Sequence, residues 1–304
     1  MANPSSLNPF KNYLRSLIDN VDKINIPKEM NLVLEGGAFN GGYMGGMLLY
    51  IRELERLKLT KIQKISGCSI GAITALLYLS DNIDKGTYFF EKILSSLRKT
   101  LSLSEIIPFI KEIVDHVDIS KLNNKLFITY YDVYEMKQIV VSTYKNKEEL
   151  IDTVIRSSFI PYIINGNLNY QDKYCDGLTP YIFKKESIPT LFIALQAFKK
   201  IKYTLYVKNE INIWSRLLEG VVDIHGFFTN NSSKFCSYID KWTLLDFHIF
   251  HFRELCYFLF VVILYYSSYI ETKLPNNIKN NKYLLRIITI FSTLYKTIFS
   301  YLII

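Results

Sequence analysis

The sequence has few of the residues that mark metal, cofactor and disulfide-rich proteins. Its four cysteines, Cys68, Cys175, Cys236 and Cys256, have neither the paired spacing of a zinc site nor that of a disulfide framework. No glycine-rich loop carries the lysine of a nucleotide-binding P-loop, and no calcium-binding loop is visible. We therefore expect no metal and no cofactor, and a reducing, intracellular environment.

We also expect no signal peptide, and the sequence has no long uninterrupted apolar segment. Its first residues do not follow the charged, apolar and small-residue order of a leader, so we expect an intracellular protein, cytoplasmic or peripherally membrane-associated. Residues 255–270 are almost entirely apolar, but this run is shorter than the roughly 20 residues that span a bilayer. Residues 287–304 separate polar from apolar side chains at helical spacing and include Lys296. The pattern favours a helix packed on the core or lying on a membrane over a spanning helix.

The charge balance is a weaker indication than these absences. The formal net charge is +8, and 49% of the residues are apolar. Such a balance suits the anionic surface of a membrane, although lysines that only keep an apolar protein soluble explain it as well. The lysines are scattered and form no basic helix or aromatic-basic module, so we expect no nucleic-acid partner.

Alternating strand and helix patterns begin after a polar N-terminal extension, residues 1–29. Residues 31–35 and 64–66 are typical of strands, and residues 47–57 and 72–79 are typical of helices. The order strand, helix, strand, helix predicts an α/β fold with a mainly parallel sheet. Further strands are expected at 126–133, 138–143 and 191–195, and further helices at 88–99 and 148–156.

Glycine is scarce, with 13 in 304 residues, and eight of the 13 lie between Gly36 and Gly71. They occupy two short turns, which suggests backbone that must bend tightly or approach a ligand. The second turn, Gly-Cys-Ser-Ile-Gly at residues 67–71, matches the G-x-S-x-G nucleophile elbow and lies between an expected strand and an expected helix. Gly67 and Gly71 would relieve the crowding of such a turn. Ser69 is therefore the candidate nucleophile of a serine hydrolase.

The first glycine-rich turn can supply an oxyanion hole. Residues 35–42, Glu-Gly-Gly-Ala-Phe-Asn-Gly-Gly, link an expected strand to an expected helix. Backbone amides near Gly37 and Ala38 can therefore converge on an acyl oxygen. A phosphate loop is the weaker alternative because no lysine follows, and a dinucleotide loop is weaker because the G-x-G-x-x-G spacing is absent.

Two kinds of base fit Ser69. Histidine is the usual partner of a nucleophilic serine, and three histidines follow Ser69 in the Ser, Asp, His order of α/β-hydrolases: His225, His248 and His251. The other candidate is Asp176, which stands before Gly177 at the end of a short strand pattern. Burial there would raise its pKa and let it accept a proton, although Asp-Gly is also common in ordinary turns.

Taken together and in this order, the motifs resemble the patatin-like phospholipase family. Residues 34–48 resemble its glycine-rich oxyanion segment, and residues 67–72 resemble its nucleophile elbow. Residues 157–161, Ser-Ser-Phe-Ile-Pro, resemble the serine-rich segment before the catalytic aspartate, and Asp176 with Gly177 matches the family's Asp-Gly pair. The resemblance implies a three-layer α/β/α fold and a Ser–Asp dyad that works without histidine. It also implies hydrolysis of fatty-acyl esters of phospholipids, lysophospholipids or neutral lipids.

Carried over residue by residue, the resemblance makes Ser69 the nucleophile and Asp176 the base. The oxyanion hole would comprise Gly36, Gly37 and Ala38, with the motifs supported by Gly41, Gly67, Gly71 and Gly177. We accordingly expect a catalytic core at residues 30–205, after the extension at residues 1–29. A hydrophobic, mostly helical region at residues 206–304 would pack on the core or contact the membrane that carries the lipid substrate.

Three positions depart from the family pattern. Ala38 stands where a third glycine is usual, Asn40 where Arg or Lys is usual, and Leu178 where a small residue is usual. Ala38 is tolerable if its φ angle is negative, because the donor it supplies is a backbone amide. Asn40 removes a cation near the site. A catalytically weak, membrane-associated relative is therefore an alternative to an active hydrolase, as is a histidine-dependent esterase.

Overall fold

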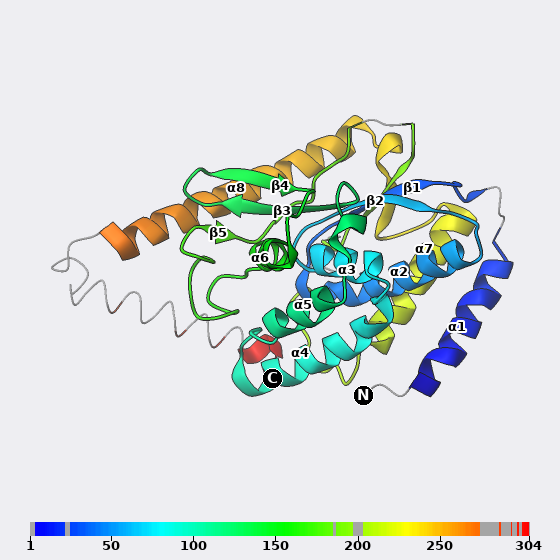
Figure 1. Ribbon diagram of the computed structural model, residues 1–304, viewed down its shortest axis with the longest axis horizontal. Helices are drawn as coiled ribbons and strands as arrows, with labels where there is room; N and C mark the ends of the chain where they lie inside the picture. The colour runs from blue at the N-terminus through cyan, green and yellow to red at the C-terminus, as the bar shows by residue number, and fades with distance from the viewer. Residues whose placement is uncertain are drawn as a thin grey trace.

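The structure, a computed structural model, describes residues 4–21, 25–184, 187–196 and 203–273, with Arg286, Thr293, Thr297 and residues 300–303 (Figure 1). The amphipathic pattern predicted at residues 287–304 therefore lies mostly outside the described residues. The last described residue belongs to the core. Ile303 is fully buried, and the amide of Val207 donates to the carbonyl oxygen of Leu302 (3.0 Å).

Within the described residues, seven strands form one mixed sheet. The strands are β1 (Met30–Leu34), β2 (Ile62–Gly67), β3 (Leu126–Asp132), β4 (Lys137–Val141), β5 (Tyr174–Cys175), β6 (Thr190–Ile193) and β7 (Cys236–Tyr238). The order is β4-β3-β2-β1-β6-β7, with β5 paired to β3. The central pairs β3-β2, β2-β1 and β1-β6 are parallel, whereas β4, β5 and β7 are antiparallel to their neighbours. The parallel centre brings the C-terminal ends of β1 and β2 to one edge of the sheet, where ligands of α/β folds usually bind.

Helices cover the two faces of the sheet unequally. They are α1 (Pro4–Asp19), α2 (Gly41–Arg56), α3 (Ile70–Leu79), α4 (Gly86–Thr100), α5 (Ile106–Asp115), α6 (Lys147–Ser157), α7 (Trp214–Asn230) and α8 (Leu244–Lys273). Figure 1 shows α1 to α7 on one side of the sheet and α8 on the other. The alternation along β1 agrees with this arrangement, because Leu32 and Leu34 join the main core whereas Val33 belongs to a separate cluster with Phe250 of α8.

The predicted α/β fold with a mostly parallel sheet flanked by helices is confirmed. The first four predicted elements appear in order as β1, α2, β2 and α3. Helix α2 begins at Gly41, earlier than predicted, because the glycine-rich stretch at residues 41–46 is helical. The sequence patterns did not predict α5, α7 or β7. Because β7 lies after residue 205, this region contributes a strand to the sheet as well as helices.

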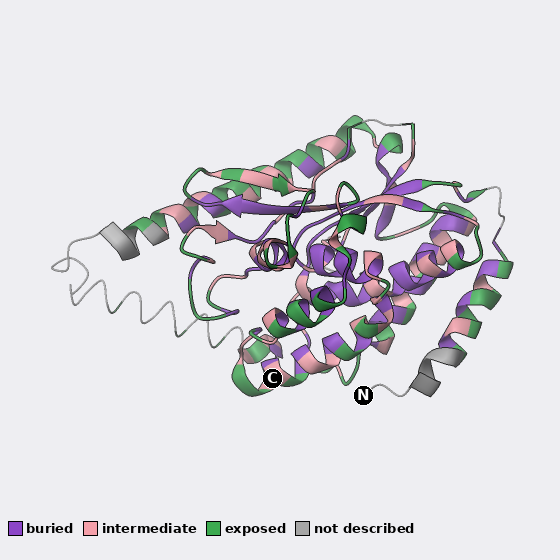
Figure 2. Ribbon diagram, viewed as in Figure 1, coloured by how far each residue is buried: buried purple, intermediate pink, exposed green. Residues whose placement is uncertain are grey.

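The apolar run at residues 255–270 is part of the much longer helix α8, which has 30 residues. By length and composition, its segment Leu244–Ser267 could cross a membrane, and only 17% of its apolar window is buried, unlike a core helix. In Figure 2, exposed and intermediate colours recur along α8, whereas the central strands are largely buried. Helix α8 therefore presents an extensive apolar surface that the described part of the chain does not cover.

Candidate active site

Ser69 lies in the sharp turn between β2 and α3. Its φ of 53° and ψ of −128° form a conformation that side-chain-bearing residues rarely adopt. An added Cβ on Gly67 would lie 2.5 Å from the carbonyl oxygen of Gly71, and one on Gly71 would lie 2.4 Å from that of Leu34. Both positions therefore require glycine. The turn holds Ser69 at the N-terminus of α3, where the helix dipole favours developing negative charge.

Asp176 reaches Ser69 because of the way β5 joins the sheet. Strand β4 occupies one edge of β3, and β2 pairs with the other edge only as far as Ile128. Strand β5 pairs with β3 beyond that point, at Tyr131 and Asp132. Asp176 follows β5 directly and arrives at the end of β2. There, the Ser69 hydroxyl donates a 2.6 Å hydrogen bond to Asp176 Oδ2.

Asp176 is a buried carboxylate held by two hydrogen-bond donors. Burial raises the pKa of Asp176 to about 6. The hydrogen bonds from the Ser69 hydroxyl and from the Leu178 amide, which lies 2.9 Å from Oδ1, act in the opposite direction. A carboxylate with a pKa near 6 is ionised at neutral pH and is still basic enough to accept a proton.

The serine-rich segment at the end of α6 connects the nucleophile to the base. The carbonyl oxygen of Ser157 accepts hydrogen bonds from the amides of Ser69 and Gly177, each at 3.0 Å. The Ser157 hydroxyl also accepts from the Ser69 amide, at 3.0 Å. The Asp176 amide donates to the carbonyl oxygen of Phe159 (3.2 Å). The sequence drew attention to this segment only through the family resemblance, and its role in holding the two residues together was not predicted.

Residues 36–40, here called the oxyanion loop, bring backbone amides close to Ser69. An added Cβ on Gly36 would lie only 3.1 Å from Ser69 Cβ, so glycine permits this close approach. The Gly36 amide is already used, since it donates to Cys68 Sγ at 3.1 Å. The amides of Gly37 and Ala38 have no acceptor among the described residues. Of the three residues predicted for the oxyanion hole, Gly37 and Ala38 thus retain an available donor, and Gly36 provides the close approach.

Ala38 does not meet the condition of a negative φ. Its φ is 42°, in the left-handed region that costs a residue other than glycine roughly 1–2 kcal/mol. Leu178, which follows the Asp-Gly pair, also has a positive φ, of 54°. Ala38, Ser69 and Leu178 therefore place three strained backbones around the candidate site. Clusters of this kind are typical of functional sites.

The remaining motif glycines allow the pieces of the site to meet. An added Cβ on Gly41 would lie 2.3 Å from the Ile70 side chain, so this glycine lets the N-termini of α2 and α3 come together. An added Cβ on Gly177 would lie 2.2 Å from the carbonyl oxygen of Thr129 and 2.9 Å from Cys68 Cβ. These contacts explain why a chain with so little glycine concentrates it here.

A positive charge lies beside Asn40, although the sequence suggested that Asn at this position removes one. The side chain is fully buried, and its Nδ2 donates to the carbonyl oxygen of Leu195 (2.9 Å) and to Thr204 Oγ1 (3.2 Å). Its Oδ1 accepts a 3.0 Å hydrogen bond from Nη1 of Arg216. Helix α7 therefore supplies a cation next to this position, from a residue that the sequence motifs did not identify.

All four histidines lie in the described residues, and none is hydrogen-bonded to Ser69 or Asp176. His225 Nδ1 lies 3.1 Å from the Tyr50 hydroxyl, and burial lowers the pKa of this histidine. His251 is exposed and pairs with Glu254 at 2.7 Å. His116 and His248 are also exposed. The geometry therefore gives no support to a histidine base.

An apolar pocket begins at Ser69 and extends among α2, α3, α4 and α5. It encloses about 870 Å³ of space, including its open mouth. Ile73, Leu77, Phe90 and Ile106 are among its lining residues, and the described part of the chain contributes no charged side chain to it. Its lining has the polarity of a site for an apolar ligand.

The described residues contain no group of three or more His, Cys, Asp or Glu side chains that could hold a metal ion. In a comparison with known families, residues 32–179 match the family described as Patatin, patatin-like phospholipase. The matched segment begins in β1 and ends shortly after Asp176, so it contains the oxyanion loop, the Ser69 turn and the candidate base. No curated protein matches the chain.

Proposed function

We propose that the patatin-like phospholipase domain at residues 32–179 hydrolyses fatty-acyl esters of lipids with Ser69 as nucleophile and Asp176 as base. The observation that carries the proposal is the 2.6 Å hydrogen bond from Ser69 Oγ to a buried carboxylate. It occurs on a strained turn at a helix N-terminus, beside two available backbone amides. These are the nucleophile, base and oxyanion donors that acyl transfer requires.

The proposed reaction proceeds through an acyl-enzyme. Asp176 takes the proton of Ser69 while Oγ attacks the ester carbonyl carbon, and the amides of Gly37 and Ala38 stabilise the oxyanion. Asp176 then gives the proton to the leaving alcohol as the ester bond breaks. Water, activated by the same carboxylate, attacks the acyl-serine and releases the fatty acid. Each oxyanion donor is worth about 10²–10³ in rate.

The pocket beside Ser69 supports a substrate with a long acyl chain. Its wall is apolar, and none of its described lining side chains is charged. A fatty-acyl chain would therefore occupy the pocket, and a phospholipid headgroup or a glycerol would remain outside it. We propose phospholipids, lysophospholipids or neutral acylglycerols as substrates.

Helix α8 supports a membrane surface as the place where substrate is met. Phe252, Leu255 and Ile263 are more than half exposed, and the net charge of +8 favours anionic lipid. We propose a cytoplasmic protein bound peripherally through this helix. Flotation with anionic vesicles tests this: Phe252→Ser combined with Ile263→Ser should weaken binding without reducing turnover of a water-soluble ester. Undiminished vesicle binding by this variant would contradict the proposed surface.

Turnover of a phospholipid and acylglycerol panel tests the chemistry. Compared with wild type, Ser69→Ala and Asp176→Asn should each lose about 10³-fold or more in kcat, because nucleophile and base act as a unit. A fluorophosphonate probe should label wild type and not Ser69→Ala.

Two results would contradict parts of the proposal. Retained turnover in Asp176→Asn would show that Asp176 is not the base, and would leave the assignment of Ser69 as nucleophile unaffected. An absence of Ser69-dependent labelling would instead indicate an inactive scaffold. Ala substitutions of His225, His248 and His251 are the matched controls, and we expect them to leave turnover unchanged.

A further inference from the structure

Helix α7 carries a buried arginine that reaches the oxyanion loop. Arg216 is 2% exposed, and its guanidinium pairs with Glu210 through Nε (2.7 Å) and Nη2. Nη1 and Nη2 also donate to the carbonyl oxygens of Tyr203 and Tyr206, each at 3.1 Å. Nη1 makes its second hydrogen bond to Asn40 Oδ1 (3.0 Å). A buried cation needs such complete pairing, because an unpaired one would be strongly destabilising.

Asn40 transmits this contact to the backbone of the oxyanion loop. Its own amide donates to the Gly37 carbonyl oxygen (2.9 Å), closing the turn that contains Ala38. Its side chain is held from the opposite side by Leu195 and Thr204. The orientation of the Asn40 side chain, and with it the direction of the Gly37 and Ala38 amides, therefore depends on Arg216 together with these partners.

The packing of α7 against α2 fixes where the guanidinium can lie. An added Cβ on Gly46 would lie 2.0 Å from the carbonyl oxygen of Leu217, and one on Gly220 would lie 2.0 Å from that of Tyr43. An added Cβ on Gly42 would lie 3.0 Å from Arg216 Cβ. The two helices are thus in backbone contact, which places Arg216 beside the start of α2.

We propose that Arg216 is a positioning residue of the hydrolase, acting through Asn40 to keep the Gly37 and Ala38 amides directed at the acyl oxygen. The inference rests on the proposed function. It also extends the catalytic unit beyond residues 32–179 to the segment from Tyr203 to α7. An arginine is required because its planar guanidinium bonds Asn40, Glu210 and two carbonyl groups at once, which an ammonium group does not do.

A double-mutant cycle between Arg216 and Asn40 tests this role, with p-nitrophenyl butyrate as a soluble ester. We expect Arg216→Lys and Asn40→Ala each to lower kcat by about 10- to 100-fold with little change in KM, because misplaced oxyanion donors affect the transition state more than substrate binding. The double variant should be no slower than the slower single variant, because both remove the same contact.

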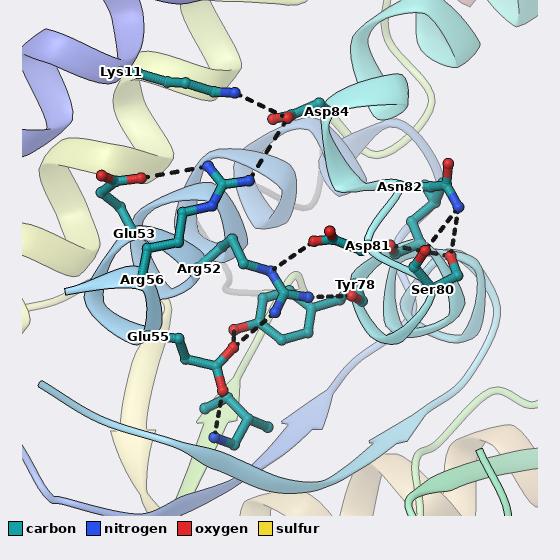
Figure 3. A network of polar contacts seen from close by, with 12 residues as sticks. Lys11, Arg52, Glu53, Glu55, Arg56, Tyr78, Ser80, Asp81, Asn82 and Asp84 are labelled. Atoms are coloured by element: carbon teal, nitrogen blue, oxygen red, sulfur yellow. Dashed lines mark hydrogen bonds and ion pairs between the residues drawn. The ribbon is translucent and has the colours of Figure 1, made fainter. Parts of the chain in front are cut away.

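The control is Arg52→Lys, at the opposite end of α2. Arg52 is also in a dense polar network, where it bonds Glu55 (2.9 Å) and the carbonyl oxygen of Tyr78 (Figure 3). None of the residues labelled in that network lines the pocket that begins at Ser69. Arg52→Lys should leave the kcat of the folded protein unchanged. Circular dichroism and thermal melting measure the folded fraction of every variant. Glu210→Gln provides a second cycle with Asn40→Ala, since it loosens the guanidinium without removing it.

The outcomes separate the inference from the proposed function. Multiplicative kcat effects in the cycles, or unchanged kcat in folded Arg216→Lys, would overturn the positioning role while wild-type turnover and Ser69 labelling persist. Loss of kcat in Arg52→Lys equal to that in Arg216→Lys would also overturn it, because the effect would then be general. A wild type without Ser69-dependent turnover would refute the proposed function itself.

Discussion

The two ends of α2 use buried charge for opposite purposes. At the C-terminal end, Arg52 lies 3.9 Å from the centroid of the Tyr78 ring, and Glu55 accepts hydrogen bonds from the Tyr78 hydroxyl (2.6 Å) and the Ile62 amide (2.7 Å) (Figure 3). Glu53, which is 1% exposed, pairs with Arg15 of α1 at 2.7 Å. These contacts join α1, α3 and β2 to α2.

At the N-terminal end the polar contacts hold strained backbone in place. Ala38 and Ser69 both have positive φ angles, Asp176 is buried with a raised pKa, and the Gly37 and Ala38 amides have no acceptor within the described part of the chain. Arg216 supports this end from α7. Charge at the C-terminal end thus stabilises the fold, whereas the N-terminal end keeps Ala38, Ser69 and Asp176 in states that oppose folding. Removing the Asp176 charge or the strain at Ala38 should therefore stabilise the protein, whereas removing Arg52 should destabilise it.

The largest expected effect on stability is that of Asp176→Asn. The pKa of Asp176 is about 6 in the folded protein, and its ordinary value is 3.8. The folded protein therefore holds this proton more tightly than the unfolded chain, and stability falls as pH rises from 3.8 to about 6, by about 3 kcal/mol in total once the carboxylate is ionised in both states. Asp176→Asn should be more stable than wild type at pH 7.5 and lose that advantage as pH falls towards 4. Urea unfolding at several pH values measures the difference, and a less stable Asp176→Asn at neutral pH would contradict it.

Arg52→Ala should have the opposite sign. The substitution removes the cation beside Tyr78 and Glu55, so we expect it to destabilise the protein by about 2 kcal/mol. The kcat of the folded fraction should stay at the wild-type value, because the network lies at the end of α2 away from Ser69. Urea unfolding combined with turnover of a soluble ester checks both points. A folded Arg52→Ala variant with a tenfold lower kcat would contradict the view that only the N-terminal end of α2 affects catalysis.

Ala38→Gly gives the smallest effect. Glycine adopts a φ of 42° without steric cost, so the substitution should stabilise the protein by up to about 1 kcal/mol, less the entropy that glycine loses on folding. Turnover should be retained, because the amide donor is retained. Thermal melting of Ala38→Gly beside Ala72→Gly, a buried helical position without strain, provides the measurement. Equal destabilisation in both variants would show that Ala38 stores no strain.

The sequence predicted the parts of the site that lie within short segments. The Ser69 turn and the oxyanion loop are local patterns of glycine between a strand and a helix, so their residue types and spacing indicate their geometry. The residues alone did not decide whether the base for Ser69 is a histidine or Asp176. Asp176 was selected only by the family resemblance, because its approach depends on β5 pairing with β3 beyond the end of β2.

What the sequence did not predict depends on contacts between distant segments. Arg216 is 176 residues from Asn40, and Ser157 is 88 residues from Ser69, so no periodicity connects them. The positive φ of Ala38 and the use of the Gly36 amide by Cys68 are equally invisible in a pattern of residue types. Helix α8 was recognised only in its most apolar part, because its first turns contain Asp246 and His248 among the apolar residues.

The most direct test of the Ser69–Asp176 dyad is the rate at which p-nitrophenyl butyrate acylates the enzyme on both sides of pH 6, followed by intact-mass spectrometry and peptide mapping. We expect a butyryl group on Ser69. Its rate of formation should fall about tenfold per pH unit below about 6 as Asp176 becomes protonated, and Asp176→Asn should show almost no acylation at any pH. Acylation of Asp176→Asn at the wild-type rate, or a butyryl group on any residue other than Ser69, would contradict it.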